Sequence, residues 1–516
     1  MKVYYFLLAV LFVVSTNVSM FAQEETEEIT ESAAGDIINQ AGGFENFDFS
    51  SGGLDKESAL GAFLGYSKIG DEGFVGMRLR PDFSFGKFGV GLNIPIMFST
   101  SDWSFRKDEF QDGIGWARII DYVRYGVKKR DPFYIRVGSL TGSYIGYGLL
   151  LDNYTNVISF DKRKLGATFD ILIGEMVGIE GLYSDFDMSS FNLLALRPYV
   201  KPLAKTGLPI VKTVDVGYTF VTDHDKTSIG LTDSTAMQNK YIEAGQNAWS
   251  VDMGIIPINR SFMQLRVYTQ YGVLQKNTSA LLQDTLNNLA DSLRGTGLDD
   301  DNPLIAGNNV AGTNNYDKGS GFSVGADFRF NFGAKTLQLQ ARIERLWYNA
   351  FFTPQFYNAG YEFGKDSKLI MLSQTDGKKG IYGSLTGVFM EKVLIGGSLM
   401  IPDNASEIAP GVMTLNFDAS KLFKKIVLKG QYIKGGLTSL KDALVFDEHS
   451  LATARVAYKM YKFLVVGLDY KWTWSKQADN TFEVNNYVSP YIGFSMPLNF
   501  GSSSKSPIDF NLDDEE

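Results

Sequence analysis

The sequence has no cysteine, only two histidines and only 14 prolines among 516 residues. Without cysteine the chain can form no disulfide, thiolate metal site, thiol nucleophile or N-terminal lipid-anchored cysteine. Beyond residue 22 no apolar run approaches the roughly 20 residues that a membrane-spanning helix requires. A basic stripe of the kind that binds nucleic acid is also missing, so we expect no nucleic-acid partner. No cofactor and no metal are expected.

The first 22 residues have the layout of an export signal. Lys2 supplies a positive charge, Tyr4 to Val14 form an apolar run, and a polar stretch leads to Ala22. The apolar run has about half the roughly 20 residues needed to cross a bilayer, which argues against a membrane anchor. We therefore predict a signal peptide over residues 1–22.

The net charge of −9 is concentrated at the two ends of the mature chain. Residues 23–60 hold ten acidic residues and one lysine, and residues 501–516 hold five acidic residues and one lysine. The intervening residues 61–500 therefore carry a small positive charge of +3. The acidity belongs to two tails that flank a nearly neutral body.

Between the tails the chain is rich in glycine and aromatic residues, with 53 Gly, 38 Phe and 26 Tyr. Apolar and polar residues alternate with the period of two that is typical of strands, most clearly in Phe322–Phe330 and Leu337–Glu344. A soluble β-sandwich alternates in the same way, because one face of each sheet is buried. About 20 such segments follow one another without a helical layer between them, and this repetition favours a membrane-spanning barrel.

The links between the predicted strands form two classes, short and long, that alternate as they do in membrane β-barrels. The short links lie near 86–87, 129–132, 174–175, 259–260, 333–335, 391–392, 422–423 and 461–462. The long links cover about 99–115, 141–160, 223–247, 275–319, 348–380, 402–411, 436–449 and 475–484. Two links depart from the alternation: 201–209 is long for its class and 185–190 is short.

The last predicted strand ends at Phe500 and has apolar residues on one face, namely Val488, Ile492, Phe494, Met496, Leu498 and Phe500. Together with the export signal and the series of hairpins, this strand resembles the large outer-membrane β-barrels of Gram-negative bacteria, of the porin or transport-channel type. The resemblance covers residues 59–500 and rests on pattern, not on a specific motif. It implies an all-β fold, a closed antiparallel transmembrane β-barrel with short periplasmic turns and long extracellular loops.

The number of strands follows from the parity of the links. A first strand over 59–68 and a second over 73–83 give about 20 strands, with both termini in the periplasm; if the first segment lies in the lumen instead, 18 strands remain. The expected organisation is a signal peptide (1–22), an acidic N-terminal segment (23–58), the barrel (59–500) and an acidic periplasmic tail (501–516). The N-terminal segment is either a flexible periplasmic arm or a small hatch that enters the lumen.

The resemblance also implies partners and a location. We expect residence in the bacterial outer membrane, in contact with its lipid and lipopolysaccharide, and recognition of the last strand by the barrel-assembly machinery. The acidic tails are candidate sites for a periplasmic partner.

Charged residues between outward apolar neighbours are the candidate site, because charge on the lipid face of a barrel is costly and rings of charge in a lumen tune selectivity. Two interpretations stay open for each residue: it sets solute preference, or it only pairs with a neighbour of opposite charge. Arginines outnumber acidic residues in this set, which weakly favours anionic solutes. The predicted lumen residues are Arg78, Arg80, Arg136, Arg266, Asp327, Arg329, Arg342, Glu344, Asp469 and Lys471.

Other patterns carry weaker hypotheses. Asp223–Asp225 and Asp299–Asn302 hold oxygen ligands that Ca²⁺ accepts, but neither has the spacing of a metal loop, so solvated loops are expected. Residues 279–294 have leucines at helical spacing, which predicts an amphipathic helix that either forms a lid or packs on neighbouring loops. An enzyme is not expected, because neither His224 nor His449 lies in a catalytic pattern.

The sequence therefore predicts an outer-membrane channel, similar to a porin, for small polar or charged solutes. The alternative is a non-conducting barrel that acts as a structural or interaction component of a secretion, adhesion or envelope-assembly machine. A carrier of hydrophobic molecules is a further alternative, which an apolar lumen would identify.

Overall fold

The structure, a computed structural model, describes most of residues 59–497. The longest gaps in that range are 111–114, 157–163, 187–191, 232–239, 278–317, 363–367, 406–410 and 477–481. The predicted signal peptide, the N-terminal acidic segment, the C-terminal tail with Phe500, and the predicted helix at 279–294 all lie outside the described residues, as does Asp299–Asn302.

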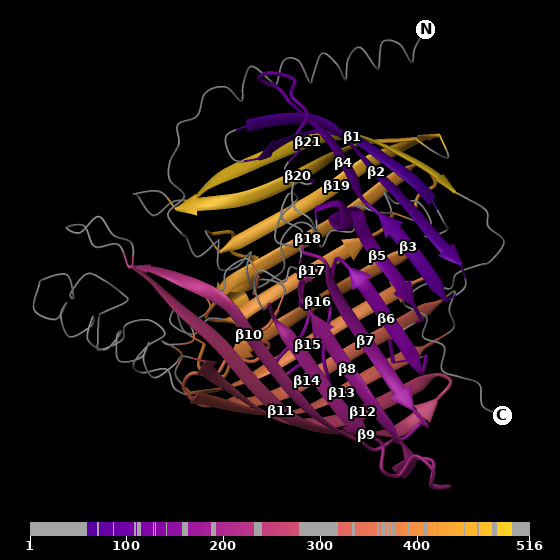
Figure 1. The fold of residues 1–516 in the computed structure, drawn as a ribbon, viewed down its shortest axis with the longest axis vertical. Helices are drawn as coiled ribbons and strands as arrows, with labels where there is room; N and C mark the ends of the chain where they lie inside the picture. The colour runs from indigo at the N-terminus through magenta and orange to yellow at the C-terminus, as the bar shows by residue number, and fades with distance from the viewer. Residues whose placement is uncertain are drawn as a thin grey trace, which may run out of the picture.

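The described chain forms one antiparallel sheet of 21 strands (Figure 1). The first seven are β1 (Ala59–Ile69), β2 (Glu72–Phe85), β3 (Phe88–Leu92), β4 (Ile94–Ser99), β5 (Ile120–Tyr125), β6 (Phe133–Gly138) and β7 (Gly166–Ile173). The next seven are β8 (Val177–Tyr183), β9 (Leu194–Val200), β10 (Asp215–Leu231), β11 (Lys240–Arg260), β12 (Met263–Asn277), β13 (Lys318–Asn331) and β14 (Leu337–Tyr348). The last seven are β15 (Lys378–Phe389), β16 (Val393–Pro402), β17 (Gly411–Asp418), β18 (Ile426–Leu437), β19 (Ser450–Tyr461), β20 (Leu464–Lys476) and β21 (Phe482–Pro497). The prediction of an all-β antiparallel fold is confirmed.

Neighbours in sequence are neighbours in the sheet, with one interruption. β2 pairs with both β3 and β4, and β3 pairs onward with β5, so β3 and β4 occupy one position in the sheet and are separated at Asn93. At the ends of the chain, β1 pairs with β2 on one side and with β21 on the other. Figure 1 shows β1 and β21 side by side, although more than 400 residues separate them.

The strand bounds change the predicted links at two positions. The structure extends β10 to Leu231 and begins β11 at Lys240, so most of the predicted loop at 223–247 is strand. The prediction was wrong there because polar residues, among them Asp223–Asp225, were interpreted as loop although they continue a ladder with β11. The link at 201–209 extends to residue 214 and contains a short 3-10 helix, η5 (Val211–Thr213).

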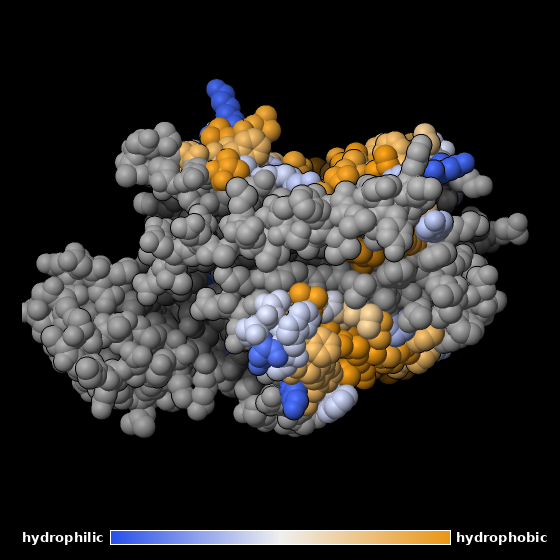
Figure 2. All heavy atoms as spheres, turned by 90° about the horizontal axis from the view of Figure 1, so that it is seen from above, coloured by the Kyte–Doolittle hydropathy of each residue, from blue (hydrophilic) through white to orange (hydrophobic). Residues whose placement is uncertain are grey.

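The two faces of the sheet have opposite character. On β13, Phe322 and Val324 are 39% and 40% exposed, whereas Ser323 between them is 0% exposed. The same inversion recurs on β10, β11, β12, β14, β15 and β19, and Figure 2 shows broad hydrophobic patches on the surface. We call the exposed apolar face the outer face and the opposite, polar face the inner face.

The few described helical segments are short. They include two further 3-10 helices, η4 (Gly115–Ile119) and η7 (Leu440–Leu444). Within the described part of the chain, no helix has the length and apolar character needed to cross a membrane.

The β1–β21 pairing can be tested by cross-linking, because a chain without cysteine accepts engineered cysteines cleanly. Gly61 lies opposite Ser495, and Ala62 lies opposite Phe494. Adjacent pairs alternate between wider and closer separation, so at least one of these two cysteine pairs should oxidise to a disulfide. The measurement is the gel mobility of the oxidised, denatured protein. A Gly61→Cys, Tyr487→Cys pair is the out-of-register control, and failure of both in-register pairs contradicts the pairing.

Candidate functional site: the charged inner face and its inner loop

Part of the link between β6 and β7 lies against the inner face of the sheet. This first inner loop (residues 139–156) leaves β6 at Gly138, whose φ of +133° is rarely open to a residue with a side chain. A Cβ at Gly138 would lie 2.3 Å from the carbonyl oxygen of Asp121. The loop is closed by a bridge between Ser143 and Tyr154, and it reaches side chains of β9, β12 and β14.

A buried charge cluster surrounds Arg197 of β9. The Arg197 Nε donates to Asp252 Oδ2 of β11 at 2.9 Å, and Nη1 donates to Glu180 Oε1 of β8 at 2.6 Å. Nη2 pairs with Asp252 and, at 3.2 Å, with Asp215 Oδ2 of β10. The side chains of Arg197 and Glu180 are 1% and 0% exposed. Three carboxylates thus share one guanidinium, and we call these four residues the Arg197 cluster.

Two lysines of the β5–β6 turn supply further positive charge to this cluster. Lys129 pairs with Glu180, and Lys128 Nζ lies 3.5 Å from Glu180 Oε2. Lys128 also donates to the carbonyl oxygen of Tyr144 in the first inner loop, and its ammonium lies 4.2 Å from the centre of the Tyr144 ring. Burial lowers the pKa of Lys128 to about 8, against the opposing effect of Glu180. The turn therefore fastens the loop to the cluster from one end of the sheet.

A second cluster lies at Arg342 of β14. Arg342 pairs with Glu344, and its Nη1 lies 2.8 Å from Asp152 Oδ2 of the first inner loop. The Tyr268 hydroxyl of β12 accepts from Arg342 Nε at 2.8 Å and donates to Glu344 Oε1 at 2.7 Å. We call these four residues the Arg342 cluster. Because Asp152 belongs to the loop, this cluster is complete only when the loop lies in place.

Tyr147 joins the two clusters. Its hydroxyl donates to Asp215 of the Arg197 cluster, and its carbonyl oxygen accepts from Arg342. Its ring stacks on that of Tyr268, with centroids 4.5 Å apart and planes 5° apart. A Cβ at position 254 would lie 1.9 Å from the Tyr147 hydroxyl, so Gly254 of β11 leaves the space that this side chain fills.

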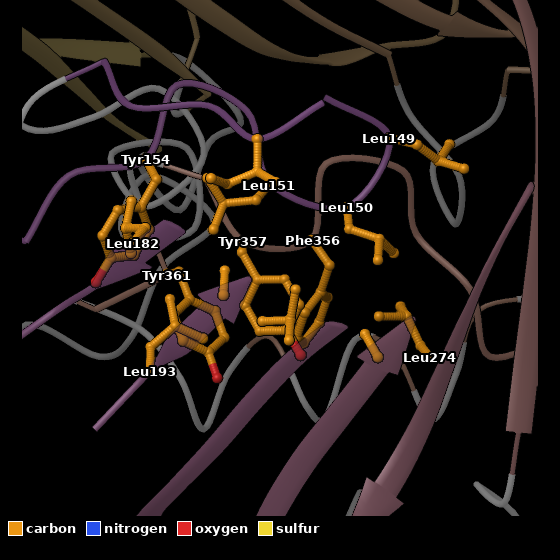
Figure 3. Close-up of a cluster of buried hydrophobic side chains, with 14 of the residues drawn as sticks. Leu149, Leu150, Leu151, Tyr154, Leu182, Leu193, Leu274, Phe356, Tyr357 and Tyr361 are labelled. Carbon is orange, nitrogen blue, oxygen red and sulfur yellow. The ribbon is translucent and has the colours of Figure 1, made fainter. Parts of the chain in front are cut away.

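The first inner loop also contacts a second inner loop (residues 349–377, described in part). An apolar cluster forms where the two loops meet. Figure 3 shows Leu150 and Leu151 beside Phe356 and Tyr357, and Leu149 and Tyr361 belong to the same cluster. The two loops are hydrogen bonded, since Tyr357 N donates to Leu150 O at 3.0 Å and Gln355 N donates to Leu149 O at 2.7 Å. Leu151, Phe352 and Tyr357 are 0% exposed. The apolar core of the inner loops therefore continues into buried side chains of the sheet, among them Leu182, Leu274 and Leu346.

The predicted lumen residues fall into three groups. Arg342, Glu344 and Asp469 have an oppositely charged partner within 4 Å, as do Asp327 and Arg329, which are paired with each other at 3.6 Å. Arg266 lies opposite Asp327 in the β12–β13 register with its guanidinium 6.0 Å from the Tyr147 ring centre, and Arg136 lies over Tyr122. The structure places Arg78 and Arg80 on β2 and Lys471 on β20, and their side chains are outside the described residues.

The structure brings in several charged residues that the sequence did not single out. Arg197, Glu180, Asp252 and Asp170 have the same signal as those predicted, a charge between apolar neighbours in a strand. The strands of Arg197, Glu180 and Asp170 are only seven or eight residues long, whereas Asp252 lies in the long strand β11. Elsewhere on the inner face, between β19 and β20, Arg455 makes two 2.6 Å hydrogen bonds with Asp469. No strand periodicity signals Tyr147 or Asp152, because both lie in a loop.

The predicted acidic loop at Asp223 has a different role. Asp223 lies in β10, is 2% exposed, and accepts a hydrogen bond of 2.8 Å from the Tyr361 hydroxyl of the second inner loop. It ties that loop to the wall of the sheet, so the expectation of a solvated loop at this residue was wrong.

Comparison with known proteins gives no family. No protein-family model and no curated protein matches the chain. Three solved structures illustrate the likeness. CdiB from Acinetobacter baumannii is 6% identical over 86% of this chain (TM-score 0.29), and the match spans only 60% of CdiB. The outer membrane protein opdK from Pseudomonas aeruginosa is 10% identical over 86% of this chain and 99% of its own (TM-score 0.29).

The ferric-catecholate import receptor Fiu from E. coli K12, in its closed form, is 11% identical over 86% of this chain and 81% of its own (TM-score 0.35). The matched structures are outer-membrane β-barrels, the group that the strand pattern resembles. At these TM-scores the likeness carries nothing beyond that resemblance.

Replacement of Tyr147 by phenylalanine should loosen the first inner loop, because it leaves a carboxylate of the Arg197 cluster without its hydroxyl donor. The loss of such a hydrogen bond costs about 1–3 kcal/mol. Amide hydrogen exchange of residues 143–152 in detergent micelles should therefore speed up about 5- to 150-fold. Tyr218→Phe, on the outer face, is the matched control. Equal exchange in the two variants contradicts the role of the Tyr147 hydroxyl.

The lowered pKa of Lys128 predicts a pH dependence of stability. Between pH about 8 and 10.5 the unfolded chain holds a proton on this amine that the folded chain has released, so folded-state stability contributed by Lys128 rises with pH across that window. Lys128→Met removes this contribution. The melting temperature of the wild type relative to the variant should therefore increase from pH 8 to pH 10. Lys392→Met, an exposed lysine in the β15–β16 turn, should show no such trend; a pH-independent difference for Lys128→Met contradicts the prediction.

Proposed function

We propose that the sheet closes into a barrel with 20 strand positions around its circumference, and that this barrel spans the bacterial outer membrane. The observation in favour of closure is that β1 pairs with β21 as well as with β2. Since β3 and β4 occupy one position, the 21 strands would give 20 strand positions around the barrel, the number that the parity of the links predicts.

The inverted faces of the sheet carry the membrane proposal. A protein dissolved in water exposes charge and buries apolar side chains, whereas this sheet exposes Phe322, Val324 and Ile343 and buries Ser323 and Glu344. Phe322 of β13 and Phe332, directly after that strand, mark the two ends of its apolar band, and both are exposed. The ten residue steps from one to the other extend about 33 Å along a strand and about 25 Å when tilted by about 40°, which is the height of the apolar band in membrane barrels.

The orientation follows from the links. The short turns, including the one that carries Lys128, would lie in the periplasm with both termini, and the long loops outside the cell. Residues 1–22 would direct export, Phe500 would serve recognition by the barrel-assembly machinery, and the acidic segments 23–58 and 501–516 would be available to a periplasmic partner. Lipid and lipopolysaccharide would surround the outer face.

The barrel is proposed to pass small polar or charged solutes, and not to act as an enzyme. Support comes from the inner face, where ion pairs and hydroxyl groups line the wall beside the first inner loop. Barrels of this size are wide enough to hold water and an inserted loop. The preference for anions that the arginine count suggests is weakened, because Arg197, Arg342 and Arg455 each pair with carboxylates.

One observation favours the second candidate, a non-conducting barrel that serves as an interaction component. The apolar cluster between the two inner loops is buried as completely as the core of a soluble protein, and a filling of that kind resists displacement. A carrier of hydrophobic molecules is less well supported, because the apolar side chains of the described inner face are packed against the inner loops.

Conductance in a planar lipid bilayer separates these functions. The wild type should give stable, salt-dependent steps, and a variant in which Gly-Gly replaces residues 144–153 should conduct several-fold more, because the loop narrows the lumen. Deletion of residues 440–446, a loop with strongly exposed side chains at Leu440 and Leu444, is the control and should leave conductance unchanged. Silence of both the wild type and the loop variant, with the barrel intact by heat-modifiable gel mobility, contradicts the channel.

A further inference from the structure

In the described part of the chain, one row of residues across the inner face contains two arginines that are not paired with carboxylates, unlike Arg197 and Arg342. Gly89 of β3, Arg124 of β5, Arg136 of β6 and Thr168 of β7 are direct partners from strand to strand. The row belongs to the inner face, because Tyr125, next to Arg124, and Phe133, three residues before Arg136, point to the opposite face and are 43% and 42% exposed. Like charges placed directly opposite each other on neighbouring strands destabilise a sheet.

The contacts of these arginines differ from those of Arg197 and Arg342. Among the described residues, neither Arg124 nor Arg136 has a carboxylate within 4 Å. Arg136 donates from Nε to the carbonyl oxygen of Ser139 at 3.2 Å, and its guanidinium lies 4.5 Å from the Tyr122 ring centre. The Nε of Arg124 is buried without a hydrogen-bond partner.

Two further polar side chains near the row are buried and unsatisfied. The Oγ1 of Thr168 has no partner, although Thr168 is only 3% exposed. Asn93, at the break between β3 and β4, is 0% exposed, and neither its Nδ2 nor its Oδ1 has a partner. Asn93 N donates to Ile119 O, beside the start of β5, and Asn93 lies two residues beyond Gly91, the partner of Tyr122 in register. Buried polar groups without partners are rare, and several on one wall indicate a missing polar ligand.

The glycines of β3 allow the side chains of Arg124 and Tyr122 to lie over that strand. Gly89 and Gly91 carry no side chain where their neighbours in register, Arg124 and Tyr122, extend. A Cβ at Gly89 would lie 3.2 Å from Tyr122 Cε2 and 3.4 Å from Arg124 Nη2, so these two side chains lie over the glycines.

We infer that Arg124, Arg136 and Thr168 form an oxyanion-binding site in the lumen. An oxyanion between the two guanidinium groups cancels their repulsion and accepts charge-assisted hydrogen bonds, with the Thr168 hydroxyl as a further donor. The ligand is the phosphate or carboxylate group of a permeating solute. The inference rests on the proposed function only in that the solute reaches the site through the lumen.

The direct test is calorimetric titration of the purified full-length protein in detergent with inorganic phosphate, acetate and chloride at equal ionic strength. Phosphate or acetate should bind and chloride should not, and the stronger of the two identifies the source of the oxyanion. Arg124→Gln and Arg136→Gln should each weaken binding at least about tenfold. Arg260→Gln, which removes the same charge from an exposed position at the end of β11, should bind as the wild type does.

Thr168→Val keeps the shape of the side chain and should weaken binding by a smaller factor, of about three to tenfold, even if an arginine variant fails to fold. No saturable binding of either oxyanion to the wild type, or equal binding in Arg124→Gln and Arg260→Gln, overturns the site. The bilayer measurement distinguishes this failure from failure of the channel. If the barrel binds an oxyanion but does not conduct, the site is supported and the channel is contradicted. If the barrel conducts but binds no oxyanion, the channel is supported and the site is contradicted.

Discussion

The free energy of a buried charge dominates this structure, because a charged side chain removed from water must find a partner or be strongly destabilising. Arg197 meets that condition with carboxylates from β8, β10 and β11, so one guanidinium fixes the relation of four neighbouring strands. Arg342 meets it partly with Asp152, which belongs to a loop. The charges of the wall and the position of the first inner loop are therefore not independent: removing the loop leaves the wall with unpaired charge.

The same condition explains why the loop lies where it does. Tyr147 and Asp152 each satisfy a charged cluster, while Leu149, Leu150 and Leu151, between them in sequence, pack on the second inner loop. Polar ends with an apolar middle suit a segment that bridges a charged wall and a dry core. The row at Arg124 and Arg136 is the part of the described wall to which the inner loops bring no carboxylate, and this is why a solute is inferred to supply the anion.

The strands and their sidedness were predictable from sequence because a period of two with long apolar residues on one face is a local signal. Phe322–Phe330 and Leu337–Glu344 show it without ambiguity. β5 and β6 give a weak signal because each has only six residues. The site was predictable only where a charge interrupts a clear strand, as at Arg342 and Glu344. The rest of the site depends on contacts between residues far apart in sequence, such as Tyr147 with Asp215, and a local sequence pattern cannot predict such contacts.

The central claim is that the apolar face of the sheet meets lipid and the charged face lines an interior. The most direct test is a nitroxide scan of single cysteines at residues 322–330 in lipid vesicles, which the absence of native cysteine makes clean. Accessibility to oxygen should peak at positions 322, 324, 326, 328 and 330, and accessibility to a water-soluble nickel complex should peak at the positions between them. An inverted pattern, or one without a period of two, would contradict the account.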